Sequence, residues 1–167
     1  RIRTLFKYGY DAGLIDAPIR FGPTFKRPAK RIIRAHRQRR GPRLFEARHL
    51  RRIIKAAPLP LKAMILLGIN AGFGNGDCGR LPKSAVDLKS GWINFPRPKT
   101  AVERRVPLWP ETIEAIKQAL AERPEAKDAA HDNLVFITKY GQPWAKETSD
   151  SPISKEMRKL LDGLDLY

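Results

Sequence analysis

The segment 17–43 limits what the first part of this chain can fold into more than any other feature of the sequence. It reads APIRFGPTFKRPAKRIIRAHRQRRGPR, with prolines at positions 18, 23, 28 and 42 and no acidic residue. Proline lacks a backbone N–H and its ring clashes with the preceding helical turn, so this spacing predicts that the segment forms no helix. Uncompensated positive charges repel one another, which favours an extended chain.

The linker divides the chain into three predicted parts. We expect the end of a helical domain at 1–16, a basic linker at 17–45 and a second domain at 46–167. The chain begins at Arg1 inside a helical pattern and stops at Tyr167 without a terminating signal, so we interpret it as a fragment of a longer protein.

Positive charge is concentrated near the start of the chain. The formal net charge is +16, and residues 1–55 hold 17 Lys and Arg against Asp11, Asp16 and Glu46. Those residues therefore carry +14, which leaves +2 for residues 56–167. Such a segment gains affinity for nucleic acid by neutralising phosphates and releasing counterions. The predicted contacts are the nine linker cations between Phe21 and Arg43: Lys26, Arg27, Lys30, Arg31, Arg34, Arg37, Arg39, Arg40 and Arg43. A solvated charge run without a partner is the alternative, and the sequence leaves it open.

The composition argues against disulfide, metal and membrane proteins. Cys78 is the single cysteine, which excludes a disulfide within the chain, and the three histidines lack metal-ligand spacing. The longest apolar stretch, 63–69, is far shorter than the roughly 20 residues that a membrane helix needs. We expect a cytoplasmic protein that binds no metal or small-molecule cofactor and does not associate with a membrane.

Hydrophobic periodicity predicts helices at about 2–13, 46–57, 60–71 and 110–122 and from 151 onward. The glycines at 72, 74, 76 and 79 predict a flexible turn, and strand residues occur at 92–95, 102–108 and 134–138. The first two strands and the Pro-rich bend between them predict a β-hairpin with Lys99 in or near its tip. The expected fold class is therefore α+β: mostly α-helical with a small antiparallel β-sheet, preceded by a helix and the extended basic linker.

Two short motifs match functional patterns without the context that those patterns require. Residues 74–79, GNGDCG, match the dinucleotide fingerprint GxGxxG, but no strand precedes them and Pro82 follows almost at once. Two HxxR strings begin at His36, in the linker, and at His49, on a surface helix, and we assign neither a catalytic role. A nicotinamide-nucleotide enzyme stays the weakest hypothesis, and it would need a parallel sheet.

Three runs occur in a fixed order: LLGINAGFGNGDCGRLPKSAVDL, GWINF and RPKTAVERRVPLWPETIEAI. They resemble the catalytic domain of the tyrosine recombinases, the phage-integrase family, in which a helix ends in TGLRxxE and is followed by an Asp-hydrophobic pair, a strand, a lysine-bearing hairpin and RxVPL before a helix. The matching residues are Ala71-Gly72-Phe73, Asp77, Leu81, Asp87-Leu88, Lys99-Thr100 and Arg105-Val106-Pro107-Leu108. The preceding helix and linker resemble the end of the family's core-binding (arm) domain and its interdomain connection.

The resemblance implies DNA strand exchange through a 3′-phosphotyrosyl link, without a metal or a nucleotide. It implies that Lys99 is the general acid that protonates the departing 5′ oxygen, and that Asp77 is a supporting carboxylate. A lysine in a turn more often serves only to keep the protein soluble. The assignment of Lys99 as a general acid therefore depends on the resemblance. Duplex DNA is the expected partner, with further contacts from Arg97, Arg104 and Arg105. The protein would be nucleoid-associated when bound to DNA, and a homo-oligomer on DNA is left open.

Position 74 departs from the family pattern, because Gly74 stands where the first catalytic arginine belongs and has no side chain to donate to a phosphate. Arg80 is the candidate replacement, although a surface arginine in a flexible turn is the plainer interpretation. The family's catalytic HxxR motif and its nucleophilic tyrosine are expected beyond Tyr167. Our leading hypothesis is a DNA-binding segment of a recombinase that cannot cleave DNA alone. The alternative is a recombinase-derived DNA-binding protein whose whole parent is inactive.

Overall fold

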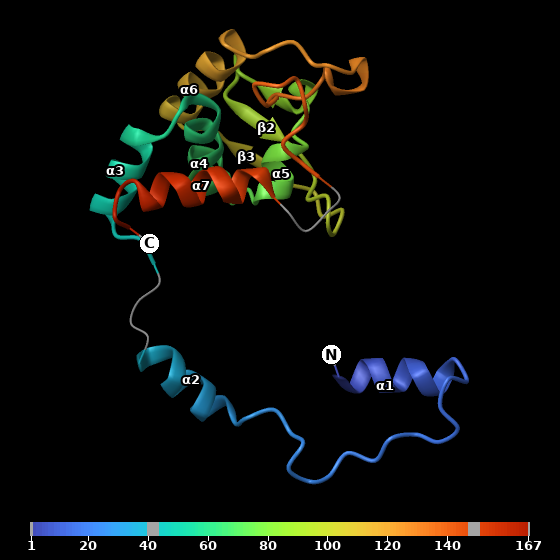
Figure 1. Ribbon diagram of the computed structural model, residues 1–167. Helices are drawn as coiled ribbons and strands as arrows, with labels where there is room; N and C mark the ends of the chain where they lie inside the picture. The colour runs from blue at the N-terminus through green and yellow to red at the C-terminus, as the bar shows by residue number, and fades with distance from the viewer. Residues whose placement is uncertain (1, 40–43, 147–150, 167) are drawn as a thin grey trace. The chain divides into compact units, whose positions relative to one another are not determined.

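The computed structural model describes residues 2–39, 44–146 and 151–166 (Figure 1). It divides into two compact units, Arg1–Leu44 and Phe45–Tyr167, which are described separately below. Among the described residues, no helix has both the length and the apolar character needed to cross a membrane.

In the first unit, the described residues 2–39 form two helices joined by an irregular segment. Helix α1 spans Ile2–Asp11, as predicted, and the chain then turns at Gly13, whose φ of +67° favours glycine. An aromatic cluster follows, in which the Phe21 ring stacks on Phe25 at 4.8 Å and meets Phe6 edge-on at 6.1 Å. Arg3 donates from Nη2 to the Phe25 carbonyl at 2.6 Å. These contacts hold the start of the linker against α1.

Helix α2 spans Lys30–Arg39, so the prediction that the prolines exclude a helix from 17–43 was wrong for these residues. Pro28 precedes the helix and Pro42 follows it, which leaves room for nearly three helical turns between them. Arginine, lysine and glutamine are good helix formers, and they dominate this stretch. The irregular part of the linker is therefore shorter than expected.

The second unit is built around α4, Leu59–Ala71, six of whose thirteen residues are buried. Helix α6, Pro110–Ala121, packs along α4, and α3, Ala47–Ala56, lies beside it. Helix α7, Pro152–Asp162, contacts both α3 and α4 and crosses them in Figure 1. Predicted starts agree with the caps: proline occupies the first turn of α4, α6 and α7. α3, α4 and α6 were predicted within a few residues of both observed ends, and α7 within a few residues of its observed start.

The small antiparallel sheet of the predicted fold class is confirmed. It has three strands in the order β1 (Val86–Asp87), β2 (Trp92–Asn94) and β3 (Arg105–Pro107). Ile93 pairs with Val106, and its side chain is fully buried against the helices. The short β1 was expected to be irregular, because two residues are too few to show the alternation typical of a strand.

Two local predictions were wrong. Residues 75–79 form a short helix, α5 (Asn75–Gly79), rather than a flexible turn, because the Asp77 carboxylate accepts the Gly74 N–H and caps the first turn. Residues 134–138 form no strand: Leu134 makes an isolated bridge with Pro82, and Ile137 makes another with Pro143. Their buried apolar side chains explain why the pattern read as a strand.

Candidate nucleic-acid interface

A buried ion pair joins the hairpin to the turn after α4. Arg104 Nη1 lies 3.1 Å from Asp77 Oδ2, and the two side chains keep only 15% and 12% of their surface exposed. The same Asp77 oxygen accepts the backbone N–H of Gly74 at 3.0 Å. Arg104 Nε donates to the Phe95 carbonyl at 3.1 Å. One carboxylate oxygen therefore links the arginine of the hairpin to the backbone at position 74.

Aromatic rings pack against the Arg104 guanidinium. Its central carbon lies 3.9 Å from the centroid of Phe73 and 6.0 Å from that of Phe95. A guanidinium held over an aromatic face gains cation–π attraction and is restricted to one orientation. Arg104 was predicted to contact DNA, and in the structure its guanidinium is largely buried and paired with Asp77.

Gly74 itself has an ordinary backbone conformation, with φ −92° and ψ 176°. A Cβ built there would meet only Asp77 Oδ2, at 3.9 Å, so no steric reason requires glycine at this position. Arg80 follows α5, and its side chain is exposed with Nη1 3.2 Å from where a Cβ on Gly76 would lie. The structure thus brings two arginines to this turn, one buried and one exposed.

Lys99 lies at the end of the β2–β3 hairpin, as predicted. The hairpin extends beyond the strands through hydrogen bonds from Phe95 N to Arg104 O and from Arg97 N to Val102 O. The chain reverses between those residues, where Ala101 has a φ of +53°. Arg97 and Lys99 are exposed. Arg105 is also exposed, and its guanidinium lies 4.6 Å from the Trp92 ring centroid on the outer face of the sheet.

The predicted DNA-contacting cations of the linker that can be described are all exposed: Lys26, Arg27, Lys30, Arg31, Arg34, Arg37 and Arg39. Arg40 and Arg43 lie outside the described residues. Four of the cations, Arg27, Lys30, Arg34 and Arg37, line one shallow hollow of about 320 Å³ together with Pro28 and Ile33. Lys30, Arg34 and Arg37 share one face of α2 because residues four and seven apart are neighbours on a helix. This shared face could not be predicted from the sequence, because no helix was predicted there.

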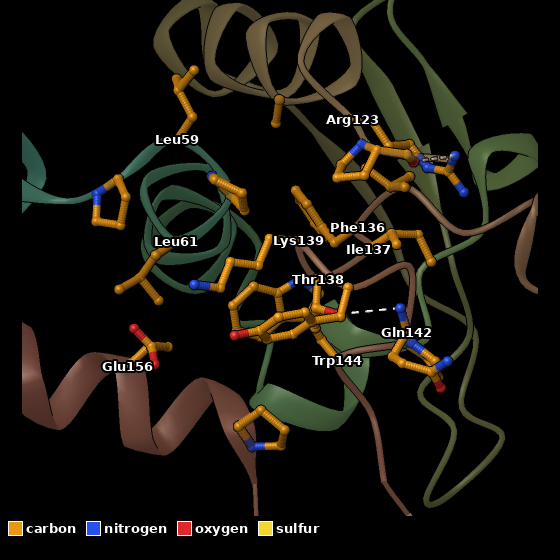
Figure 2. Close-up of a pocket in the computed structure, with 18 of the residues that line it drawn as sticks. Leu59, Leu61, Arg123, Phe136, Ile137, Thr138, Lys139, Gln142, Trp144 and Glu156 are labelled. Carbon is orange, nitrogen blue, oxygen red and sulfur yellow. Dashed lines mark hydrogen bonds between the residues drawn. The ribbon is translucent and has the colours of Figure 1, made fainter. Parts of the chain in front are cut away.

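A second feature that the sequence did not reveal is an apolar groove of about 810 Å³ (Figure 2). It lies between the start of α4, the end of α6, the segment 135–144 and α7. Trp144 lines it, and its buried Nε1 has no hydrogen-bond partner among the described residues. Arg123, which Figure 2 labels, donates hydrogen bonds to the backbone carbonyls of Leu134, His131 and Asp132. The groove therefore offers shape and apolar surface rather than a cluster of reactive groups.

The competing motifs take structural roles. The GxGxxG match follows helix α4 rather than a strand, and the sheet is antiparallel, so the context of a dinucleotide site is missing. His49 accepts the Glu46 N–H through Nδ1 at 3.3 Å and so caps α3.

Within the described residues, no group of three or more His, Cys, Asp or Glu side chains is placed to hold a metal ion. Burial raises the pKa of the Cys78 thiol to about 12, with a further contribution from the Asp77 charge, so this cysteine is not a reactive nucleophile.

Solved structures with the same fold are recombinases and integrases. The Tn1549 transposon integrase, solved with transposon right-end DNA, has a TM-score of 0.66 at 14% identity over 98% of this chain and 56% of its own. The XerA recombinase has a TM-score of 0.61 at 21% identity over 75% of this chain and 44% of its own. A lambda integrase dimer bound to a core site has a TM-score of 0.61 at 14% identity over 99% of this chain and 44% of its own. The chain thus spans about half the length of these proteins, and at such identities the likeness shows the fold.

No curated protein matches the sequence. The model of the phage integrase family, in contrast, matches residues 42–166, which is most of the chain and includes the Asp77–Arg104 pair and the hairpin. The chain therefore belongs to the phage integrase family.

Proposed function

We propose that this chain binds duplex DNA as part of a tyrosine recombinase that cleaves and rejoins strands through a phosphotyrosyl link. The family match over residues 42–166 is the observation that carries the proposal. Two of the solved relatives are complexes with DNA. Because the lambda integrase is a dimer on its core site, the proposal includes assembly of several copies on one duplex.

Charge on the first unit supports DNA binding. The cations around the α2 hollow are exposed, and the linker contains no acidic residue that could pair with them. Phosphates would replace the missing counter-charges, and the release of condensed cations would make binding strongly dependent on salt. These contacts position the protein without reading base sequence.

Lys99 would supply the proton for the leaving 5′ oxygen in the complete recombinase. Its position at the end of a hairpin leaves the ammonium group exposed and able to move toward a bound strand. A general acid must reach the atom that it protonates, and a hairpin tip allows that approach. Asp77 would act as a supporting carboxylate, which its contacts with Gly74 and Arg104 favour.

The 167 residues alone would bind DNA without cleaving it. None of the four tyrosines follows an HxxR motif in the family's arrangement, so none is expected to form the covalent link. A recombinase-derived DNA-binding protein without any activity is the second candidate, and Gly74 favours it because loss of one transition-state donor typically costs about 10² to 10³ in rate.

The first experiment measures the anisotropy of a labelled duplex with the chain at several salt concentrations, and scores covalent adducts on denaturing gels. We expect binding that weakens steeply with salt and no adduct. Absence of binding at 50 mM salt would contradict the proposal. Adduct formation by the complete parent protein would favour the active recombinase over the inactive DNA-binding protein.

A further inference from the structure

We propose that Arg104 donates to a DNA phosphate at the turn 72–77, where Gly74 offers no side chain. This inference rests on the proposed function, since it names a contact between the same interface and DNA. The ligand class is a phosphodiester, recognised by a guanidinium rather than by backbone amides.

Arg104 reaches this turn through a fixed set of contacts. Nη1 is paired with Asp77 Oδ2 at 3.1 Å, and that oxygen also accepts the Gly74 N–H at 3.0 Å. Nε is bound to the Phe95 carbonyl at 3.1 Å, and the Phe73 ring lies against the guanidinium. The Nε and Nη1 edges are therefore occupied by acceptors. The orientation of the group is set before any ligand arrives, which lowers the entropic cost of binding.

The remaining nitrogen points to a missing ligand. Nη2 is buried, and it has no hydrogen-bond partner among the described residues. An unpaired buried donor of a charged group is costly, so proteins rarely keep one unless a ligand, ion or water completes it. A phosphate oxygen is an acceptor that suits a guanidinium in charge and geometry. Nη2 exposes less than 1 Å², so the side chains that cover it must shift when the phosphate binds.

Space and charge at the turn are compatible with this contact. A Cβ at Gly74 would have only Asp77 Oδ2 within 4 Å, so the space directly beside Gly74 is open. Arg80 is the competing candidate, but its guanidinium is exposed, and no aromatic ring or carboxylate among the described residues fixes its orientation. A flexible exposed arginine must lose more rotamer entropy on binding. Arg104 is the arginine that the fold has already oriented.

The test compares two folded variants of this chain, Asp77→Asn and Asp77→Asn/Arg104→Gln. The asparagine background avoids leaving a buried carboxylate unpaired when the arginine is removed. The measurement is the slope of log affinity for a duplex against log salt. Each phosphate contact contributes about 0.9 to the magnitude of that slope, wherever along the duplex the protein binds. We expect Arg104→Gln to lower the slope by about 0.9 and the affinity in 0.1 M salt by about eightfold. The matched control, Lys117→Gln on exposed α6 surface, should leave the slope unchanged.

Equal slopes for the two folded variants would overturn the proposal, because a purely structural arginine affects stability but not counterion release. If the double variant fails to fold, nitrogen-15 spectra of the unmodified chain give a second readout. The Arg104 Nε and Nη2 resonances should shift when duplex is added, and unmoved resonances at saturating duplex would reject the contact. Failure of the unmodified chain to bind any duplex would instead refute the proposed function, and this inference with it.

Discussion

Replacing Arg34 and Arg37 together with glutamine should remove a large part of the salt dependence of DNA binding. Both residues lie on one face of α2, around the hollow that they share with Arg27 and Lys30. If each contacts one phosphate, the slope of log affinity against log salt should fall by about 1.8, which is twice the 0.9 expected per contact. Between 50 and 200 mM salt, the variant should therefore lose about tenfold less affinity than the unmodified chain loses.

Helical geometry adds a comparison that separates specific contacts from net charge. Arg39 lies nine residues after Lys30, which places it on the opposite side of α2, and it does not line the hollow. Arg39→Gln should therefore lower the slope less than Arg34→Gln or Arg37→Gln alone. Circular dichroism would verify that α2 keeps its helicity in each variant, since glutamine is itself a good helix former.

Two outcomes would contradict this reasoning. A slope that stays unchanged in the Arg34→Gln/Arg37→Gln variant would mean that the α2 face does not contact phosphates. An equal decrease from Lys117→Gln/Lys127→Gln, two exposed cations of the second unit, would mean that only the net charge matters. In the first case the basic segment would be a solvated charge run, the alternative that the sequence left open.

Three further predictions concern other parts of the chain. Gly141→Ala should lower the free energy of unfolding by about 1–3 kcal/mol more than Gly72→Ala, as measured by thermal or chemical denaturation. Both glycines have positive φ, but of the two only Gly141 would bring a Cβ close to a backbone atom, Lys127 N at 2.8 Å. Burial raises the pKa of Cys78 from 9.0 to about 12 in the folded chain. Because the thiol of the unfolded chain ionises first, the free energy of unfolding should fall as pH rises between those values. Cys78→Ala should flatten that decline when stability is measured by urea titration at each pH. In the complete recombinase, Lys99→Ala should slow cleavage far more than it weakens binding, and a bridging sulfur at the scissile 5′ position should restore cleavage; lack of rescue would argue against proton donation.

Helices that contribute an apolar face to the core could be predicted from the sequence, whereas α2 could not. α6 places its apolar residues at helical spacing and α4 is apolar along most of its length, and burial of those residues stabilises both helices. α2 consists mostly of charged and polar residues, and none of its residues is buried. The prolines at 28 and 42 were read as breaking the whole segment, although proline restricts mainly its own position and the turn before it. A gap of more than ten residues between prolines leaves room for a helix.

The short α5 was missed for a different reason. Two of its five residues, Gly76 and Gly79, are glycines, and a glycine within a helix weakens it by about 1 kcal/mol relative to alanine. In the structure, Asp77 caps the turn and pairs with Arg104, and Gly79 lies so close to Ala145 that a Cβ would approach its nitrogen to 2.7 Å. Tertiary contacts therefore stabilise this helix against its local preference. No local window of sequence contains those contacts.

The position of Arg104 could be predicted in part from strand alternation. Successive side chains of a strand point to opposite faces, so if Val106 points toward the core, Arg105 points outward and Arg104 inward. The structure agrees, with Arg105 exposed beside Trp92 and Arg104 mostly buried. Both arginines were predicted to contact DNA without use of this alternation. The partner could not be predicted, because Asp77 precedes Arg104 by 27 residues and meets it only once α5 and the hairpin pack together. An inward-pointing arginine in a strand requires a buried carboxylate or another acceptor. Such an arginine indicates that the chain must bring an acidic residue to the same place.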